Sequence, residues 1–318
     1  MIEPFKFKYV KDGNATGLFA TKGEVGNDGV KLGDHLLPFE CVYDTTTRDE
    51  RLVVTMDPRH EAIPDFVRKQ MQGSFLVLHV SKLSASQLEK LIDRHTSAQE
   101  AAARKAQLQA EGKGHLFRTE QCPCCAATVD LSELPDSPYH YCRFCETVFG
   151  RGMDRGVKAS NTYRQCDECG YYDRVQGYGE FYFYFLLVVY GFSHKRRHLC
   201  DDCGASLANK LLAVNAIFLL GVPNAVICAI RARAGRDRDL GPLAKANRLA
   251  KKGKLQQAEA EYDKVFRALP GHPGAHFNLA VAHLRQNNAD DGVAHLNKSF
   301  QSCPSFEPGI NLAHRISG

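Results

Sequence analysis

Eight of the twelve cysteines form four Cys-x-x-Cys pairs across the middle third of the chain. The pairs are Cys122/Cys125, Cys142/Cys145, Cys166/Cys169 and Cys200/Cys203. Two intervening residues let a tight turn direct both thiolates at one metal ion, and a second pair completes the tetrahedron that structural zinc prefers. The pattern therefore predicts two zinc sites, each closed by four thiolates. Because a catalytic zinc keeps one position open for water, we expect these ions to stabilise the fold.

The spacing leaves two ways of combining the pairs. Sequential combination makes two adjacent fingers, whereas cross-brace combination of alternate pairs makes one RING-like unit. RING domains have a histidine ligand and shorter outer loops, so we favour the sequential arrangement. Iron–sulfur clusters are also held by four thiolates and are an alternative to zinc. Cys124 adjoins a ligand and could replace it, and the other cysteines are expected to be core thiols: Cys41, Cys228 and Cys303.

The segment around the first two pairs has the pattern of a small β module. His140–Phe149 carries the second pair between two short apolar stretches, which is typical of a strand, a turn and a strand. Residues 115–155 therefore resemble a zinc ribbon. The resemblance implies a structural metal ion.

The segment around the last two pairs, residues 160–235, has a different pattern. The fourth pair is followed at once by Ala205–Leu220, which is expected to be a helix. A finger in which a hairpin is followed by a helix, with two ligands at the start of that helix, resembles a treble-clef finger. Gly170 and Gly204 directly follow a ligand, where glycine tolerates the backbone conformation that lets amides approach the sulfurs. The long loop between the pairs contains Phe181–Tyr190, which predicts an aromatic strand buried on both faces.

The amino terminus gives an expectation about the compartment. Residues 1–13 carry charges throughout and lack the apolar core of a secretory signal. We therefore expect a reducing, cytoplasmic environment, in which paired cysteines bind metal rather than form disulfides. The net charge of +5 is mild for 318 residues, so it permits an anionic partner without requiring one.

Residues 1–112 are expected to form an antiparallel β domain that ends in a helix. A helix capped by Ser84 or Ser86 should follow the strands, run on into solvent and end near Gly112. Several strands followed by one helix resemble the pleckstrin-homology-like fold. The predicted strands are Phe5–Val10, Gly17–Thr21, Gly29–Leu32, His35–Tyr43, Arg51–Met56 and Ser74–Val80.

The stretch Leu211–Ile230 contains no charged residue and has the length of a membrane-spanning helix. Asn215 and Asn224 are costly within a bilayer, however, and Gly221–Asn224 resembles a turn. Two alternatives remain open: a membrane span, and a hairpin of two short helices that packs on the aromatic strand.

The carboxy-terminal part of the sequence contains an internal repeat. Pro270 and Pro304 lie 34 residues apart, and Phe266 matches Phe300 at the same offset. Residues 241–318 therefore resemble two tetratricopeptide repeats followed by a closing helix over Glu307–Ile316. The resemblance implies a concave surface that binds a protein or peptide. It does not extend to the clamp for carboxylate tails, because the chain has no basic residues at the required positions.

These patterns together predict a multidomain α+β protein: an N-terminal β domain, central zinc modules and C-terminal helical repeats. No segment supplies a catalytic motif such as a phosphate-binding loop or a nucleophile elbow. We expect a non-enzymatic adaptor that binds proteins through the repeats and the fingers. Two alternatives are a nucleic-acid-binding protein that uses His194–His198 and Arg231–Arg238, and a membrane-associated regulator anchored by Leu211–Ile230.

Overall fold

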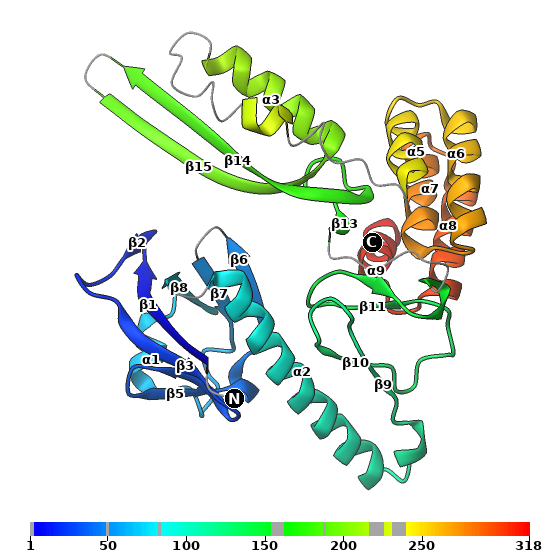
Figure 1. Ribbon diagram of the computed structural model, residues 1–318. Coiled ribbons are helices and arrows are strands. Elements are labelled where there is room, and N and C mark those ends of the chain that lie inside the picture. Colours follow the sequence, from blue (N-terminus) through cyan, green and yellow to red (C-terminus); the bar gives the residue numbers. More distant parts are fainter. Residues whose placement is uncertain are drawn as a thin grey trace. The chain divides into compact units, whose positions relative to one another are not determined.

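The computed structural model describes residues 3–48, 51–81, 84–153, 162–186, 189–215, 226–230 and 240–318 (Figure 1). The chain divides into two compact units, Met1–Leu134 and Pro135–Gly318. The predicted fold class is confirmed, because an N-terminal antiparallel sheet, central cysteine groups and C-terminal helical repeats follow one another along the chain.

The first unit contains an antiparallel sheet whose strands follow the order β5-β4-β3-β1-β8-β7-β6, with β2 paired to β1. A short helix α1 (Asp65–Gln70) precedes the last strand. Alternate residues of the strands point into one apolar core, which includes Phe5, Phe7 and Leu78. The strands are β1 (Glu3–Lys11), β2 (Asn14–Ala15), β3 (Thr21–Val25), β4 (Gly29–Leu32), β5 (His35–Pro38), β6 (Asp44–Arg48), β7 (Arg51–Thr55) and β8 (Phe75–Ser81).

Most of the predicted strands are present, but the one predicted over His35–Tyr43 ends at Pro38, where the 3-10 turn η1 (Phe39–Cys41) begins. The stretch predicted over Gly17–Thr21 is a loop up to Thr21, because Gly17 adopts a left-handed conformation and the apolar Leu18 and Phe19 side chains lie in solvent. The true strand, β3, is weakly apolar. Gly23 of this strand pairs with Phe5 of β1, and the Phe5 ring packs so closely over the glycine that a Cβ atom there would clash.

Helix α2 (Ala85–Ala110) closes the first unit's sheet and then continues beyond it. Its distal half was predicted to lie in solvent, and this prediction is wrong for two of its side chains. Ala101 and Leu108 are buried, since the helix contacts strand β10 (Thr128–Asp130) and the 3-10 turn η2 (Gly114–Leu116).

The cysteine pairs lie on short hairpins. Strands β9 (Thr119–Gln121) and β10 flank the first pair, and β11 (His140–Tyr141) and β12 (Val148–Phe149) flank the second. The 3-10 turn η3 (Arg151–Met153) follows. The hairpin predicted over His140–Phe149 is confirmed, and the first pair lies on a second hairpin of the same kind.

The third pair is flanked by β13 (Tyr163–Gln165) and the long strand β14 (Tyr172–Leu186), which pairs along its length with β15 (Val189–Cys200). The aromatic run Phe181–Tyr190 was predicted to be one strand. The structure divides its described residues between the two arms of this hairpin. Helix α3 (Asp201–Asn215) follows directly and lies along the hairpin (Figure 1).

The stretch Leu211–Ile230 is described only in part. Its first residues belong to α3 and residues 226–230 are helical, whereas residues 216–225 lie outside the described part, so neither alternative for this stretch is tested as a whole. Among the helices that are described, none combines the length and the apolar character needed to cross a bilayer.

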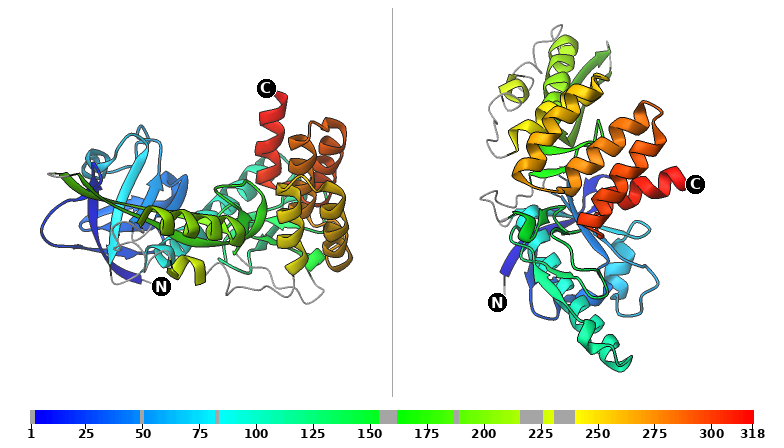
Figure 2. Two further views of the ribbon diagram at one scale, coloured as in Figure 1. Left: turned by 90° about the horizontal axis from the view of Figure 1, so that it is seen from above. Right: turned by 90° about the vertical axis from the view of Figure 1, so that its right-hand side faces the viewer.

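Five helices end the chain, as the repeat pattern predicted: α5 (Gly241–Lys251), α6 (Leu255–Ala268), α7 (Pro273–Arg285), α8 (Ala289–Ser302) and α9 (Glu307–Ser317). Neighbouring helices contact one another in sequence (Figure 2). Their apolar faces share one core with the second finger, since Tyr172, Tyr178 and Leu199 belong to the same buried cluster as Leu243 and Phe277.

The start of α2 provides a test of the fold. The Ser84 side chain accepts a hydrogen bond from the Gln87 amide, and the Gln87 side chain accepts one from the Ser84 amide, which is a capping box. We predict that Ser84→Ala lowers the free energy of unfolding of the first unit by about 1 kcal/mol in urea titrations. Ser86→Ala, at the exposed second candidate, should leave it within about 0.5 kcal/mol of wild type. Equal losses in both variants would contradict the assigned cap.

Candidate metal centres

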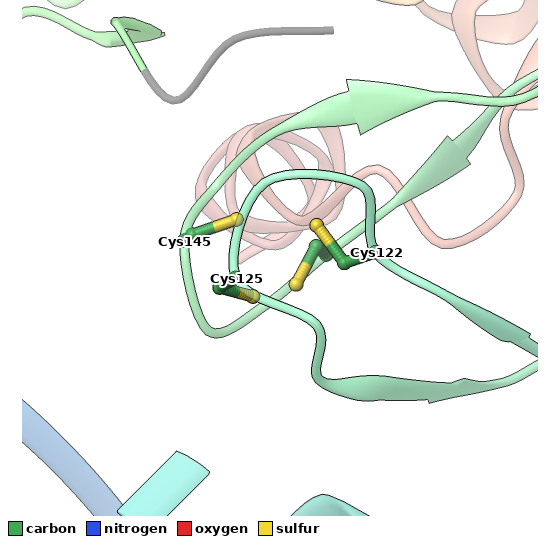
Figure 3. Close-up of side chains that lie close together, drawn as sticks. Cys122, Cys125 and Cys145 are labelled. Carbon is green, nitrogen blue, oxygen red and sulfur yellow. The ribbon is translucent and has the colours of Figure 1, made fainter. Parts of the chain in front are cut away.

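The eight paired cysteines converge into two groups of four. Cys122, Cys125, Cys142 and Cys145 form the first, and Cys166, Cys169, Cys200 and Cys203 form the second. Within each group the sulfurs lie within 4.8 Å of one another, and among the described residues these are the sets of three or more donors that could hold an ion. Figure 3 shows Cys122, Cys125 and Cys145 turned toward a common space. The grouping is the sequential one, not the cross-brace.

The first three pairs sit on turns with the same backbone hydrogen bonds. In each turn the residue after the second cysteine adopts a left-handed conformation: Ala126, Glu146 and Gly170. Its amide donates to the carbonyl of the first cysteine, at 2.9, 2.7 and 2.9 Å. The amide of the first cysteine donates to the carbonyl of the residue that directly follows the left-handed one. Only Gly170 was predicted from sequence, because alanine and glutamate give no signal for this conformation.

Gly204 was predicted to serve the same role, and the structure assigns it another. It lies in the first turn of α3, without a left-handed backbone. A Cβ atom there would meet the Tyr178 ring at 2.3 Å, so the glycine allows the helix to approach strand β14 closely. Cys203 occupies the same turn, which places the fourth pair at a helix start, as the treble-clef resemblance implied.

The second group has the dimensions of a tetrahedral thiolate site. The sulfurs of Cys169 and Cys200 lie 3.8 Å apart, and two sulfurs bound to one zinc at the usual bond length are separated by about the same distance. The Cys200 amide donates to the Cys166 sulfur at 3.3 Å. Hydrogen bonds from the other three cysteines lower the pKa of Cys166, whereas hydrogen bonds within the same group raise the pKa of Cys200 and of Cys203.

Cations from the helical repeats face this second group. Lys251 of α5 lies 3.7 Å from the Cys200 sulfur and 3.0 Å from a carboxylate oxygen of Asp202. Burial alone would lower the pKa of Lys251, but the neighbouring thiolates and Asp202 raise it above its ordinary value. Arg285 of α7 donates to the Cys169 carbonyl at 2.7 Å and lies over the Tyr171 ring. The repeats thus supply positive charge to a thiolate site.

The strand that leaves the third pair is held by two asparagines of the repeats. Asn278 of α7 binds both backbone groups of Tyr172: its oxygen accepts from the amide at 2.7 Å, and its nitrogen donates to the carbonyl at 2.7 Å. Asn247 of α5 donates to the same carbonyl at 3.1 Å and to Asp173 at 2.9 Å. Both asparagines are fully buried.

This buried network leaves no polar atom of the two amides without a partner. The Asn247 oxygen accepts from the Tyr262 hydroxyl at 2.6 Å and from Asn278 at 2.8 Å. Burial raises the pKa of Asp173 to about 6, partly opposed by the hydrogen bond from Asn247. Because each group is satisfied, the network fixes one position of the strand against the helices.

Helices α5 and α7 are the first helices of the two repeats, and β14 lies against both. The repeat resemblance implied that the repeats present a concave face to a separate protein or peptide. The structure shows that the face formed by Asn247 and Asn278 contacts this chain's own finger. The sequence pattern predicted the repeat but not this contact.

Two basic stretches had suggested nucleic-acid binding. Arg231–Arg238 lies outside the described residues. In the other stretch, Arg197 pairs with Glu168, and the His198 amide donates to Asp167 at 2.7 Å. Both contacts tie strand β15 to the turn of the third pair.

Comparison with known proteins gives one match. A family model described as "Tetratricopeptide repeat" matches residues 243–305, which spans α5 to α8 and the turn after them. No curated protein matches the chain, and no solved structure does. The match supports the repeat that the 34-residue period predicted, and the C-terminal helices are consistent with tetratricopeptide repeats.

Gly274 of α7 provides a test of the contact between finger and repeats. A Cβ atom at this position would lie 2.2 Å from the Tyr172 ring, which is enclosed by the core. We predict that Gly274→Ala lowers the free energy of unfolding of residues 135–318 by about 1–3 kcal/mol, through overpacking, in denaturant titrations of the full chain.

Gly241→Ala is the matched control, because Gly241 also lies in a helix of the repeats and a Cβ atom there meets nothing within 4 Å. It should leave the stability unchanged. A Gly274→Ala variant as stable as the control would show that Tyr172 does not pack on α7 in solution.

Proposed function

We propose that the chain is a non-enzymatic adaptor in which two structural zinc ions and a tetratricopeptide repeat pair build one platform for protein partners. The observation that carries this proposal is the shared core of the second cysteine group and the repeats, joined by the Asn278–Tyr172 hydrogen bonds. Repeats of this kind act in protein–protein interaction. Here they also position a finger, so a partner would meet both modules together.

Zinc is the proposed metal because of the ligand chemistry. Four thiolates suit zinc or a single iron, and a tetrahedral site with four protein ligands has no position for water. The 3.8 Å separation of Cys169 and Cys200 supports a single ion rather than a cluster of several irons, which holds its cysteine sulfurs further apart. A closed site also supports the proposal that the protein is not an enzyme.

Two finer assignments belong to the same proposal. The strand order of the first unit, followed by helix α2, supports a pleckstrin-homology-like fold. The pairing of thiols without disulfides supports a reducing, cytoplasmic compartment.

Metal content tests the sites directly. We predict two zinc ions per purified chain by elemental analysis. Joint replacement of Cys166 and Cys169 by serine should leave one ion, because it removes half of one tetrahedron. Cys124→Ser is the control: Cys124 adjoins the first group without belonging to it, so this variant should retain both ions. Iron in place of zinc, or loss of an ion from the control, would contradict the assignment.

The adaptor role is tested by direct binding. Proteins captured by the zinc-loaded full chain should, after purification, bind it saturably. They should bind the Cys166/Cys169 serine variant much more weakly, because its platform is not assembled. The Cys124→Ser chain should bind like wild type. If RNA or DNA is instead the one saturable ligand, with affinity falling steeply between low and moderate salt, the proposal is replaced by nucleic-acid binding.

A further inference from the structure

Histidines and carboxylates gather where helices α6, α7 and α8 meet. His276 and His283 lie two turns apart on α7, His295 lies on α8, and Glu259 and Asp263 lie one turn apart on α6. On α7, His276 is two residues beyond Gly274, which places it on roughly the opposite side of the helix from the face that contacts Tyr172. The cluster is therefore separate from the metal centres described above.

Two imidazoles of this cluster face each other. The Nδ1 atoms of His276 and His295 lie 3.2 Å apart, and the ring of His276 stacks on Phe266 at 4.3 Å between centroids. Two nitrogens bound to one tetrahedral zinc ion lie about 3.3 Å apart, given bonds of about 2.0–2.1 Å. The side chains are held by packing on three helices, so the pair is preorganised.

The surroundings supply donor groups for a metal ion, together with one cation, Lys298. A cavity of about 480 Å³ lies elsewhere, at the third cysteine pair, but a second cavity of about 350 Å³ opens at this pair. Burial lowers the pKa of His276 to about 3 and that of His295 to about 4, so both rings are neutral and offer lone pairs at pH 7. The residues that line the second cavity are Glu259, Asp263, Phe266, His276, Leu279, His295 and Lys298.

We propose that His276, His295 and Asp263 bind a divalent transition-metal ion such as Zn²⁺ on the repeats. Imidazole and carboxylate ligands suit Zn²⁺, Cu²⁺ and Ni²⁺. Both rings would bind through Nδ1 and keep their proton on Nε2.

The third ligand requires a side-chain rotation. Among the described residues only the two cysteine groups bring three donors within 4.8 Å, so the histidine pair supplies two donors and a carboxylate must join it. Asp263 is exposed and lines the same cavity. The Glu259 carboxylate also lines this cavity and lies 3.2 Å from Nε2 of His283, without the geometry of a hydrogen bond. We assign the third position to Asp263, whose exposed carboxylate lies at the same cavity.

A hydrogen bond between two neutral imidazoles would give the same Nδ1–Nδ1 distance. The experiment must therefore distinguish this hydrogen bond from a metal site. The full chain, with both cysteine sites already filled, is titrated with Zn²⁺ by calorimetry. Wild type should take up one further ion, and Zn²⁺ should raise its unfolding temperature. Asp263→Asn keeps the hydrogen bond between the rings but removes the carboxylate, so affinity should fall by about tenfold or more.

Controls make the outcome decisive. Asp290→Asn changes another exposed carboxylate of the repeats, on α8 and outside the cavity lining, and should bind like wild type. His295→Gln should lose the further ion. Absence of further uptake by wild type overturns the proposal, and so does an Asp263→Asn chain that binds Zn²⁺ as tightly as the Asp290→Asn control.

Discussion

The paired hydrogen bonds between Asn278 and the backbone of Tyr172 are the contact on which the carboxy-terminal unit depends. They join a strand that leaves a cysteine turn to a helix more than a hundred residues later in the chain, in the fully buried interior. Loss of the Asn278 side chain would leave the buried Tyr172 amide without its partner, at about 1–3 kcal/mol, whereas the Tyr172 carbonyl would keep the hydrogen bond from Asn247. Asn247, Asp173 and Tyr262 complete the network, so its members act together rather than singly.

Metal and repeats have complementary roles in this arrangement. Two tetratricopeptide repeats bury little apolar surface by themselves and need a further element to cover them. A short finger likewise lacks a core and relies on its ion. The second cysteine group fixes the turn from which β14 leaves, and β14 then covers the first helices of both repeats. In turn, Lys251 and Arg285 of the repeats place positive charge at the Cys200 sulfur and at the Cys169 carbonyl. Each module therefore supplies what the other lacks.

Sequence predicted the elements better than the contacts between them. The cysteine pairs, their sequential grouping and the repeat helices follow from short-range spacing, which a single sequence displays directly. The helix predicted from Ala205 is also present, but it begins at Asp201 and includes Cys203. The left-handed Ala126 and Glu146 could not be predicted, since these residue types do not favour that backbone. The run Phe181–Tyr190 predicts a single strand because it contains none of the residues that favour turns. The Asn278–Tyr172 contact joins residues that share no local pattern, so only the folded chain reveals it.

Hydrogen exchange on the full chain, with and without metal in the second cysteine group, tests the central claim most directly. If the finger and the repeats form one cooperative unit, removal of that ion by the Cys166/Cys169 serine replacement should lower the protection of the Tyr172 amide and of the α5 and α7 amides together. The helix α2 amides of the first unit report on a separate core and should keep their protection. Unchanged protection in α5 and α7, with loss confined to the cysteine turns, would contradict the account by showing that the repeats fold without the finger.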